Sequence, residues 1–496
     1  MTRTNTSLWQ AEPGRPAPRS PLPGDTNADV VVVGGGMVGA LLTWCLARDG
    51  HDVVLLEARQ VGDGVTGGTT AKVTALHGST YATLTRRLGE EAARDYATAQ
   101  QVGLDVVRRV VWEAGVDCGL VETDAWTYAT TDGGDERMGA EAEAARAAGL
   151  DTSFERDAPL PFRVTGAVRL PGQLQLHPVR LIGGALADAE SRGARVFEGT
   201  RVTGLHGTTR GGNLRVTTAD GHTVQARHVA VATHYPIFDR AGLFARVSVH
   251  REPALAMRSG AYDIPGMFYG ADPETFSVRP SGDDLVISGA KFRPGTGSPA
   301  RWLSTLESIV RSHLPDAGET RYRWGAQDVF SHDMLPYVGR MLPWDDRVSV
   351  ATGFGAWGLT NGAAAAEAIT ARVSGETLPW ARRFDPTRGV RASGLPSMLR
   401  EQATVGTHFV GDRLVRNGST PEPGGGAVVL RGGRHCAVHV DDDGTEHVVD
   451  ARCTHLGCLV GWNDAERTWD CPCHGSRFAV DGEVLAGPAT RPLRKR

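Results

Sequence analysis

Apolar residues near the start of the chain follow a pattern that predicts a strand, a helix and a second strand in immediate succession. The runs "DVVVVG" (29–34) and "HDVVLLEA" (51–58) are typical of short buried strands. Between them, "GGGMVGALLTWCLARDG" carries apolar residues at helical spacing and ends at Gly50. This order predicts a βαβ unit whose two strands are parallel.

Later apolar segments continue the α/β pattern. Residues 193–205 read as two strands, and "ARHVAVAT" (226–233) reads as another strand that returns to the first unit. At 348–369, "VSVATGFGAWGLTNGAAAAEAI" predicts a strand, a Gly-rich turn and a helix that begins between Gly358 and Gly362. We therefore expect a Rossmann-like domain with a second helix N-terminus near its binding site.

The last part of the chain has a different pattern. Apolar periodicity falls over residues 385–424, which end in Pro and Gly as linkers do. Beyond them, "AVVLRGGRHCAVHV" (427–440) alternates apolar and polar residues around a turn at Gly432 and Gly433, as antiparallel strands do. The chain thus predicts a large α/β domain at 29–384, a linker at 385–424 and a small all-β domain at 425–496.

The first 28 residues are polar and Pro-rich, and they lack the apolar core of a signal peptide. We therefore expect a flexible N-terminal tail at 1–28 and a cytoplasmic protein. No apolar run approaches the ~20 residues that a membrane-spanning helix needs, so no membrane span is expected. The net charge of −4 argues against a nucleic-acid or anionic-membrane partner, because both favour basic surfaces.

The glycines of the first βαβ unit predict a dinucleotide site. Gly34 permits a tight turn, Gly36 lets the backbone approach a pyrophosphate, and Gly39 lets the helix pack closely on the strand. Glu57 follows at the end of the second strand, where a carboxylate binds ribose hydroxyls and disfavours NADP. In place of the next βα unit, the chain has the Gly/Thr-rich segment 62–78. Such a loop suits close contact with a large flat ring, and this favours FAD over NAD as the cofactor.

Lysine is scarce, which draws attention to the positions that hold it. The chain has 53 basic residues, of which only Lys72, Lys291 and Lys495 are lysines. Lys72 lies in the Gly/Thr-rich segment and Lys291 lies in "GAKFRPG", and both are candidates for the reaction site. Arg279, in "FSVRPSGDD", is a candidate for clamping a substrate carboxylate. For all three candidates, an ordinary surface position is the alternative.

These segments together resemble the D-amino-acid-oxidase-like flavoproteins, which oxidise amines and amino acids with FAD. The resemblance covers residues 29–384 and includes "GVTGGTTAK" (64–72), "GQLQLHP" (172–178), "HDMLPYVG" (332–339) and "ATGFGAWGLTNG" (351–362). It implies non-covalent FAD, a backbone contact from Val202 to adenine, and an antiparallel sheet at about 240–330 that roofs the flavin and holds the substrate. The implied cofactor contacts are Gly34, Gly36, Met37, Val38, Gly39, Glu57, Ala58, Thr69, Thr70, Ala71, Lys72, Val202, Gly353, Gly358, Leu359 and Thr360.

Two short segments near the C-terminus, "CTHLGC" (453–458) and "CPCHGS" (471–476), concentrate cysteine and histidine. Their spacing alone suits either tetrahedral zinc or an iron–sulfur cluster. The full pattern resembles the Rieske proteins, which hold a [2Fe–2S] cluster. That resemblance implies one iron on Cys453 and Cys471, the other on His455 and His474, and a disulfide between Cys458 and Cys473.

The two resemblances together imply a dehydrogenase. Flavin would take a hydride from an amine or amino-acid substrate, and the cluster would pass electrons singly to an acceptor protein or a quinone-type carrier. Three alternatives remain open from the sequence: an oxidase that uses oxygen directly, a reductase or hydroxylase fed through the Rieske domain, and a redox-sensing module without catalysis. One departure from high-potential Rieske proteins is Phe478, where a Tyr hydroxyl would add a hydrogen bond.

Overall fold

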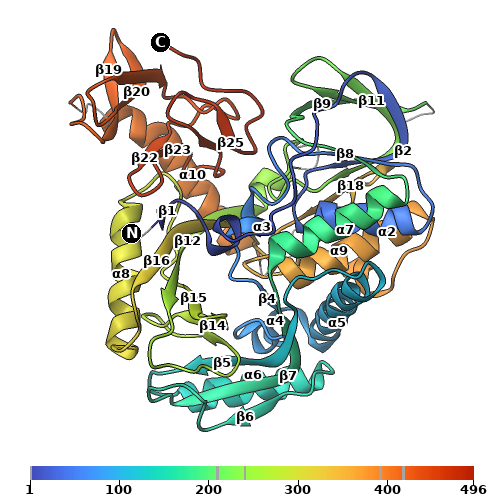
Figure 1. Ribbon diagram of the computed structural model, residues 1–496, viewed down its shortest axis with the longest axis vertical. Coiled ribbons are helices and arrows are strands. Elements are labelled where there is room, and N and C mark those ends of the chain that lie inside the picture. Colours follow the sequence, from blue (N-terminus) through green and yellow to red (C-terminus); the bar gives the residue numbers. More distant parts are fainter. Residues whose placement is uncertain (1–2, 208–211, 239–241, 390–393, 416–418) are drawn as a thin grey trace.

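A computed structural model describes residues 3–207, 212–238, 242–389, 394–415 and 419–496 (Figure 1). Its architecture is a Rossmann-like α/β domain with a second, mostly antiparallel sheet, followed by a small all-β region, as predicted from the sequence. No described helix combines the length and the apolar character needed to cross a membrane.

The nucleotide-binding sheet has the parallel core that the apolar runs predict. Its strands lie in the order β17 (Tyr337–Leu342), β18 (Asp345–Thr352), β11 (Thr223–Val231), β2 (Thr26–Val33), β3 (Val53–Leu56) and β8 (Arg195–Phe197). A hairpin of β9 (Val202–His206) and β10 (Leu214–Thr218) joins the sheet through β11. Because the second half of β2, Val30–Val33, is buried on both faces, these residues are apolar without alternation.

Helices cover one face of this sheet. These helices are α2 (Met37–Arg48), α7 (Pro178–Ser191) and α9 (Gly358–Val373), and α5 (Glu90–Glu113) packs against α9 (Figure 1). Val30 and Val32 point to these helices, while Val31 and Val33 join the apolar cluster around β9 and β10. The strand therefore separates two apolar clusters.

A second, ten-stranded sheet forms the roof, and it is larger than the predicted 240–330 segment. Its order is β1 (Arg3–Thr4), β16 (Thr320–Ser331), β12 (Val247–Arg258), β15 (Asp284–Ser288), β14 (Ser277–Ser281), β13 (Met267–Gly270), β5 (Val121–Ala129), β7 (Gly166–Gln175) and β4 (Lys72–Val73), with β6 (Ser153–Glu155) beside β7. Helices α4 (Thr80–Leu88), α6 (Gly134–Ala147) and α8 (Pro299–His313) flank it. Residues 72–175 thus supply several roof strands that the sequence did not assign there.

The described part of residues 1–28 packs on the core, unlike the flexible tail that its composition predicts. Strand β1 pairs with β16, and helix α1 (Leu8–Ala11) buries Leu8 and Trp9. The Trp9 indole N–H donates to the Thr69 carbonyl at 2.6 Å. Two buried apolar side chains and this hydrogen bond hold the segment, although its overall composition is polar.

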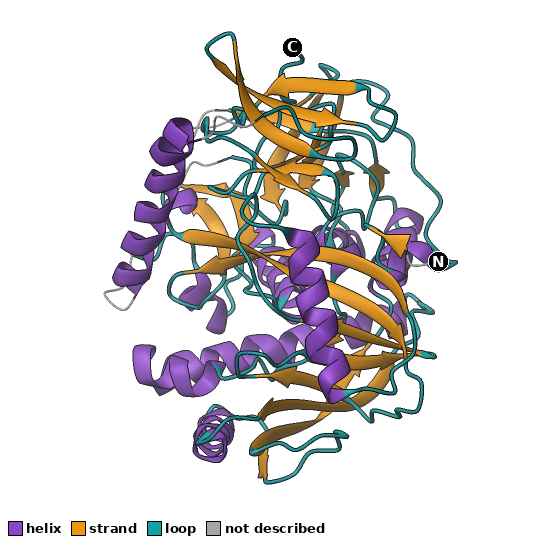
Figure 2. Ribbon diagram, turned by 90° about the vertical axis from the view of Figure 1, so that its left-hand side faces the viewer, coloured by secondary structure: helices purple, strands orange, loops and turns teal. Residues whose placement is uncertain are grey.

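The C-terminal region is all-β, as predicted. One sheet contains β19 (Gly426–Arg431), β20 (Arg434–Val440) and β21 (Glu446–Asp450), and the other contains β22 (Gly461–Asn463), β23 (Thr468–Asp470), β24 (Arg477–Phe478) and β25 (Val484–Ala486). Both views place these strands at one end of the molecule (Figure 1, Figure 2). The predicted linker contains the helix α10 (Leu395–Val415), a short helix α3 (Val65–Gly68) lies in the Gly/Thr-rich segment, and 3₁₀ turns occupy Leu243–Ala245 and Trp380–Phe384.

Candidate functional site

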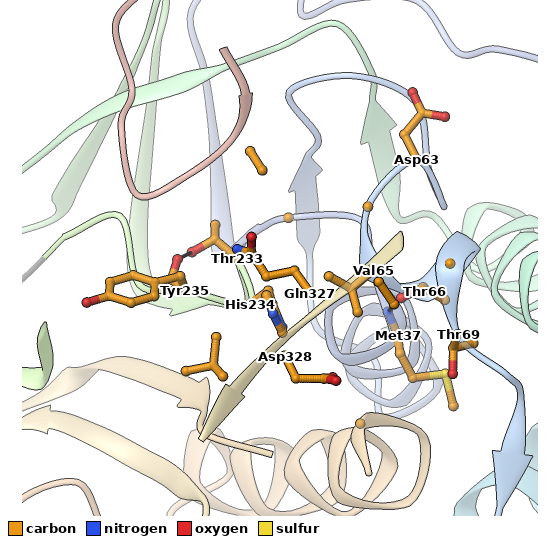
Figure 3. Close-up of a pocket in the computed structure, with 18 of the residues that line it drawn as sticks. Met37, Asp63, Val65, Thr66, Thr69, Thr233, His234, Tyr235, Gln327 and Asp328 are labelled. Carbon is orange, nitrogen blue, oxygen red and sulfur yellow. Dashed lines mark hydrogen bonds between the residues drawn. The ribbon is translucent and has the colours of Figure 1, made fainter. Parts of the chain in front are cut away.

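One cavity of about 480 Å³ joins the nucleotide-binding sheet, the roof and the Rieske region. Figure 3 shows a part of its wall, with residues from the start of α2, the Gly/Thr-rich segment, the end of β11 and strand β16. The predicted cofactor contacts that line it are Gly34, Gly36, Met37, Val38, Glu57, Ala58, Thr69, Thr70, Lys72, Val202, Gly358 and Leu359. The structure therefore brings together segments that are more than three hundred residues apart in the chain.

The glycines of the first βαβ unit have the conformations that their predicted roles require. Gly34 has a φ of +105°, in the region that favours glycine. A Cβ on Gly39 would stand 1.8 Å from the Gly34 carbonyl oxygen, so only glycine fits this close approach. Gly39 packs against the turn at Gly34 and is not part of the cavity wall in the described structure.

Two helix N-termini open onto the cavity. The N-cap positions are Gly36 for α2 and Trp357 for α9, and neither has a side-chain cap among the described residues. Although Thr66 accepts the Met37 N–H at the start of α2, the other first-turn N–H groups and the helix dipole favour anionic or electron-rich groups. The arrangement fits a pyrophosphate at α2 and the pyrimidine end of a flavin at α9.

Glu57 holds the expected place at the end of β3. Its carboxylate accepts the backbone N–H groups of Gly35 at 2.7 Å and Arg59 at 2.8 Å, which fixes its orientation. Burial raises its pKa, and these two N–H groups offset part of that effect. The remaining acceptor capacity of its oxygens suits ribose hydroxyls.

Three other predicted contacts lie outside the described cavity wall. Ala71 is buried beside it, Gly353 lies at the end of β18, and the Thr360 hydroxyl donates to the Thr74 carbonyl at 3.1 Å. A residue that the sequence did not single out, Thr66, contributes to the wall instead and accepts the Met37 N–H at 2.9 Å. These positions support the turns around the cavity.

Lys72 is the one predicted reaction-site residue that lines the cavity. Its ammonium donates to the Ser277 hydroxyl at 2.5 Å, and the residue is 8% exposed. Burial, followed by the nearby charge of Arg279, lowers the pKa of Lys72 to about 7. A substantial neutral fraction near pH 7 lets this amine accept a proton.

Arg279 does not face the cavity, and its position argues against the predicted clamp on a substrate carboxylate. Its guanidinium donates to the carbonyl oxygens of Thr70 at 2.6 Å, Leu176 at 3.1 Å and Pro280 at 2.8 Å. These bonds use most of its donors. Arg279 therefore holds the segment that carries Lys72 in place through these hydrogen bonds.

Lys291 lies at the edge of the roof, outside the described cavity wall. Its ammonium is 3.5 Å from the Tyr269 hydroxyl and 4.0 Å from a Glu252 oxygen. Burial opposes its charge, but Tyr269, Glu252 and Asp328 overcome this effect and raise its pKa. It is a permanent cation near the cavity and not a candidate base at neutral pH.

The two cysteine–histidine segments form a matched pair of loops. In each loop the glycine four residues after the first cysteine donates its N–H to that cysteine's carbonyl, from Gly457 to Cys453 at 2.9 Å and from Gly475 to Cys471 at 3.0 Å. Both glycines have positive φ, which the tight turn requires. The two loops place the first cysteine of each segment, Cys453 and Cys471, next to each other.

The predicted cluster ligands converge in the structure. The buried side chains of Cys453 and Cys471 are neighbours, and the rings of His455 and His474 are 5.0 Å apart between centroids. His474 Nε2 is buried without a hydrogen-bond partner among the described residues. A pair of neighbouring cysteines and a pair of neighbouring histidines fit a [2Fe–2S] cluster of the Rieske type, in which each iron takes one such pair.

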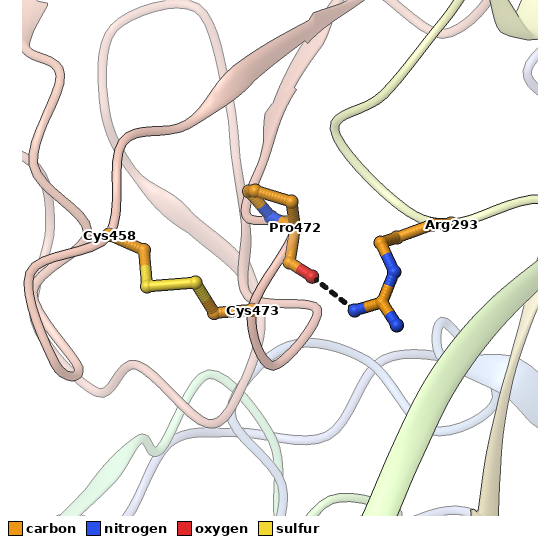
Figure 4. Close-up of a disulfide and its surroundings, with 4 residues drawn as sticks. All are labelled: Arg293, Cys458, Pro472 and Cys473. Atoms are coloured by element: carbon orange, nitrogen blue, oxygen red, sulfur yellow. Dashed lines mark hydrogen bonds between the residues drawn. A yellow bond between two sulfur atoms is a disulfide. The ribbon is translucent and has the colours of Figure 1, made fainter. Parts of the chain in front are cut away.

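The predicted disulfide joins Cys458 to Cys473 (Figure 4). The Sγ atoms of Cys458, Cys471 and Cys473 lie within 4.8 Å of one another, but the disulfide removes two of them from the possible ligands. Figure 4 also shows Arg293 donating to the Pro472 carbonyl at 2.9 Å, so a roof loop contacts the second cysteine loop directly.

The Rieske region packs tightly on the roof and closes part of the cavity. Its residues in the wall are Glu466, Thr468, Arg477, Leu485, Ala486, Gly487, Ala489 and Thr490. Gly475 lies against β12, where an added Cβ would stand 2.7 Å from Val249. The His474 ring contacts Tyr235 and Phe244 edge-on, at 6.1 and 6.0 Å between centroids.

A buried ion-pair network joins the two regions. Glu466 accepts from Arg251 at 2.6 Å, from the Gly325 N–H at 2.9 Å and from Arg477, which also binds Asp470 at 3.0 Å. Arg251 is 1% exposed at its side chain and Glu466 5%. Sequence analysis missed this network because Arg251 and Glu466 are 215 positions apart.

Comparison with known proteins gives two family matches. Residues 29–372 match the family model "FAD dependent oxidoreductase", and residues 415–495 match "Rieske [2Fe-2S] domain". A full-length relative is "Putative Rieske 2Fe-2S iron-sulfur protein YhfW" of Bacillus subtilis (strain 168), 34% identical over 99% of this chain and 96% of that protein.

Solved structures with a similar fold match the first part of the chain. Glycine oxidase from Geobacillus kaustophilus has a TM-score of 0.62 at 21% identity and covers 74% of this chain and 100% of its own. L-proline dehydrogenase from P.horikoshii has a TM-score of 0.61 at 18% identity and covers 73% of this chain and 98% of its own. At these identities the likeness concerns the fold.

Proposed function

The chain belongs to the FAD-dependent oxidoreductase family and ends in a Rieske [2Fe–2S] domain, and from this we propose that it is a dehydrogenase. Its substrate is an amine or an amino-acid-type compound that loses a hydride from the carbon next to nitrogen. The electrons leave one at a time for an external acceptor, either a protein or a quinone-type carrier.

The observation that carries this proposal is the shared cavity wall. Glu466, Arg477 and the segment 485–490 contribute to the same cavity as the FAD-binding turns at Gly34–Val38 and Gly358. His474, a candidate cluster ligand, is covered by Tyr235, which also lines the cavity. Such direct packing supports electron transfer within one chain, without movement of the Rieske domain.

Each cofactor has a set of residues that would hold it. The α2 and α9 N-termini, Glu57 and Val202 suit FAD, while Cys453, Cys471, His455 and His474 suit the cluster. When bound, FAD supplies a two-electron hydride acceptor and the cluster a one-electron carrier. This division suits a substrate that gives two electrons and an acceptor that takes one.

The chain's own contribution to the chemical step is positioning and proton transfer. Oxidation of H–C–N–H to C=N removes a hydride from carbon and a proton from nitrogen, and the nitrogen must be neutral first. Lys72 Nζ lines the cavity with a pKa near 7, so it can accept the proton from nitrogen and pass it to solvent. The Ser277 hydroxyl, which accepts a hydrogen bond from Lys72 Nζ, fixes the position of this Lys72 nitrogen.

His474→Ala tests the proposed electron route, with His435→Ala as the control for a histidine of the same domain. The first variant should lose cluster iron and keep FAD, while the control keeps both. Anaerobic stopped-flow reduction of the flavin by substrate should stay near the parent rate in His474→Ala, and reduction of cytochrome c as one-electron acceptor should collapse. Normal turnover with oxygen in this variant would support the oxidase alternative, in which electrons leave directly from the flavin.

A further inference from the structure

We propose that the substrate is an organic cation without a carboxylate, and that the carboxylates of Glu252 and Asp328 recognise it. This inference rests on the proposed function and narrows its substrate class from amines and amino acids to cationic amines. It comes from the charges that the roof presents to the cavity.

Glu252 and Asp328 share one face of the roof. Strands β12 and β16 are antiparallel with Glu252 opposite Ala326, so Asp328, two residues further, is the diagonal neighbour of Glu252 on the same face. Both residues line the cavity. Figure 3 shows the Asp328 side chain projecting from its strand into it.

The charge of these carboxylates is only partly compensated, by Lys291 and, when it is protonated, by Lys72. In the described part of the chain, no hydrogen bond reaches either carboxylate, and the nearest cation to Glu252 is Lys291 at 4.0 Å. Glu252 is 7% exposed. A buried carboxylate without hydrogen bonds is costly, and a cationic ligand between the two would remove that cost.

Each arginine in the described cavity wall already bonds to protein. Within the described residues, this wall contains Arg59, Arg201, Arg251 and Arg477, and each is already bonded to protein: to the Asp63 carbonyl, the Val484 carbonyl, Glu466 and Asp470. A substrate carboxylate near Glu252 and Asp328 would instead meet like charges. The charge pattern thus disfavours α-amino acids.

Aromatic rings complete a site suited to a cation. Tyr269, Phe354 and Trp357 line the same cavity, and the rings of Tyr269 and Trp357 are 5.1 Å apart between centroids. The faces of such rings attract alkylammonium groups. Carboxylates with aromatic walls favour an N-alkylated or otherwise compact amine.

Asp328 also gives the site a pH dependence. Burial, then the Glu252 charge, raises the pKa of Asp328 to about 7, while Lys291 and Arg251 act in the opposite direction. Lys72, whose pKa is also near 7, faces Glu252 and loses its positive charge over the same range. Both changes favour a bound cation as pH rises through 7, so binding of a permanent cation should strengthen in that direction.

Tetramethylammonium and pivalate test the inference, since they have similar size and opposite charge. Binding to the FAD-loaded protein is followed by perturbation of the flavin absorption band, which needs no turnover. Tetramethylammonium should bind and pivalate should not. Asp328→Asn and Glu252→Gln should each weaken tetramethylammonium binding at least tenfold at pH 8, and Asp328→Asn should reduce its dependence on pH.

Asp283→Asn is the matched control, because Asp283 is a roof carboxylate that is 87% exposed. It should bind tetramethylammonium like the parent. Tighter binding of pivalate than of tetramethylammonium, or unchanged cation binding in both cavity variants with FAD loaded, would overturn the inference. Failure of every amine to reduce the flavin, with cation binding intact, would instead count against the proposed dehydrogenase.

Discussion

Replacing Glu466 with Gln is expected to weaken the attachment of the Rieske domain to the roof. The network contains two arginines, Arg251 and Arg477, and two acids, Glu466 and Asp470, so it is balanced in charge. The substitution removes one negative charge and keeps the shape, which leaves one buried guanidinium charge uncompensated. Burial and the charge of Arg477 already lower the pKa of Arg251, which shows how much its cation depends on nearby acids.

The size of the effect follows from the burial of the pair. Two unit charges about 4 Å apart interact by about 4 kcal/mol at an effective dielectric constant of 20. Removing one partner of a buried pair typically costs about 3–5 kcal/mol, a large part of the roughly 5–15 kcal/mol that stabilises a domain. We therefore expect Glu466→Gln to cause a clear fall in the unfolding temperature of the protein when both cofactors are bound.

Thermal unfolding measured by calorimetry, alongside visible circular dichroism of the cluster, is the assay. The control is Asp442→Asn, which removes an exposed ion pair to Arg467 in the same domain and should change stability by less than about 1 kcal/mol. Adding Arg251→Met to Glu466→Gln should recover part of the loss, because it removes the stranded charge. If Glu466→Gln unfolds at the parent temperature, the network does not hold the domain and the reasoning is refuted.

Three further substitutions test other parts of the account. Because the neutral form of Lys72 grows as pH rises through about 7, flavin reduction should accelerate over that range; Lys72→Met should lose this dependence and be more than about tenfold slower by stopped-flow. Arg279→Lys should lower FAD retention, measured by absorbance after dialysis, because one ammonium cannot serve the three carbonyls that Arg279 binds. Phe478→Tyr should raise the cluster potential in voltammetry by about 40 mV, the equivalent of one net hydrogen bond of ~1 kcal/mol; an unchanged potential would mean that the hydroxyl points away from the cluster.

Features encoded locally were predictable from the sequence. The turn at Gly34, the close packing at Gly39 and the acid at Glu57 fall within one βαβ unit, whose geometry fixes their roles. The two cysteine–histidine loops are likewise short and closed by their own glycines, and the resemblance of their pattern to the Rieske proteins implied the disulfide between Cys458 and Cys473.

Features that depend on distant pairings were not predictable. Arg279 looked like a substrate clamp, but its partners at Thr70 and Leu176 are more than a hundred residues away. The alternation along β16 places Asp328 on the cavity face, yet only the pairing with β12 brings Glu252 beside it. Leu8 and Trp9 are the buried apolar pair that holds the N-terminal segment on the core, and the polar composition of the whole segment hid this signal.

The central claim is that electrons from the substrate reach the cluster through the flavin of the same chain. Anaerobic mixing with a reducing amine, followed by rapid freezing and electron paramagnetic resonance, tests it most directly when flavin absorbance is recorded in parallel. If electrons follow this route, flavin bleaching comes first, and the Rieske signal then grows at a rate independent of protein concentration. A flavin that is fully reduced while the cluster stays oxidised, and that oxygen then reoxidises directly, would contradict it.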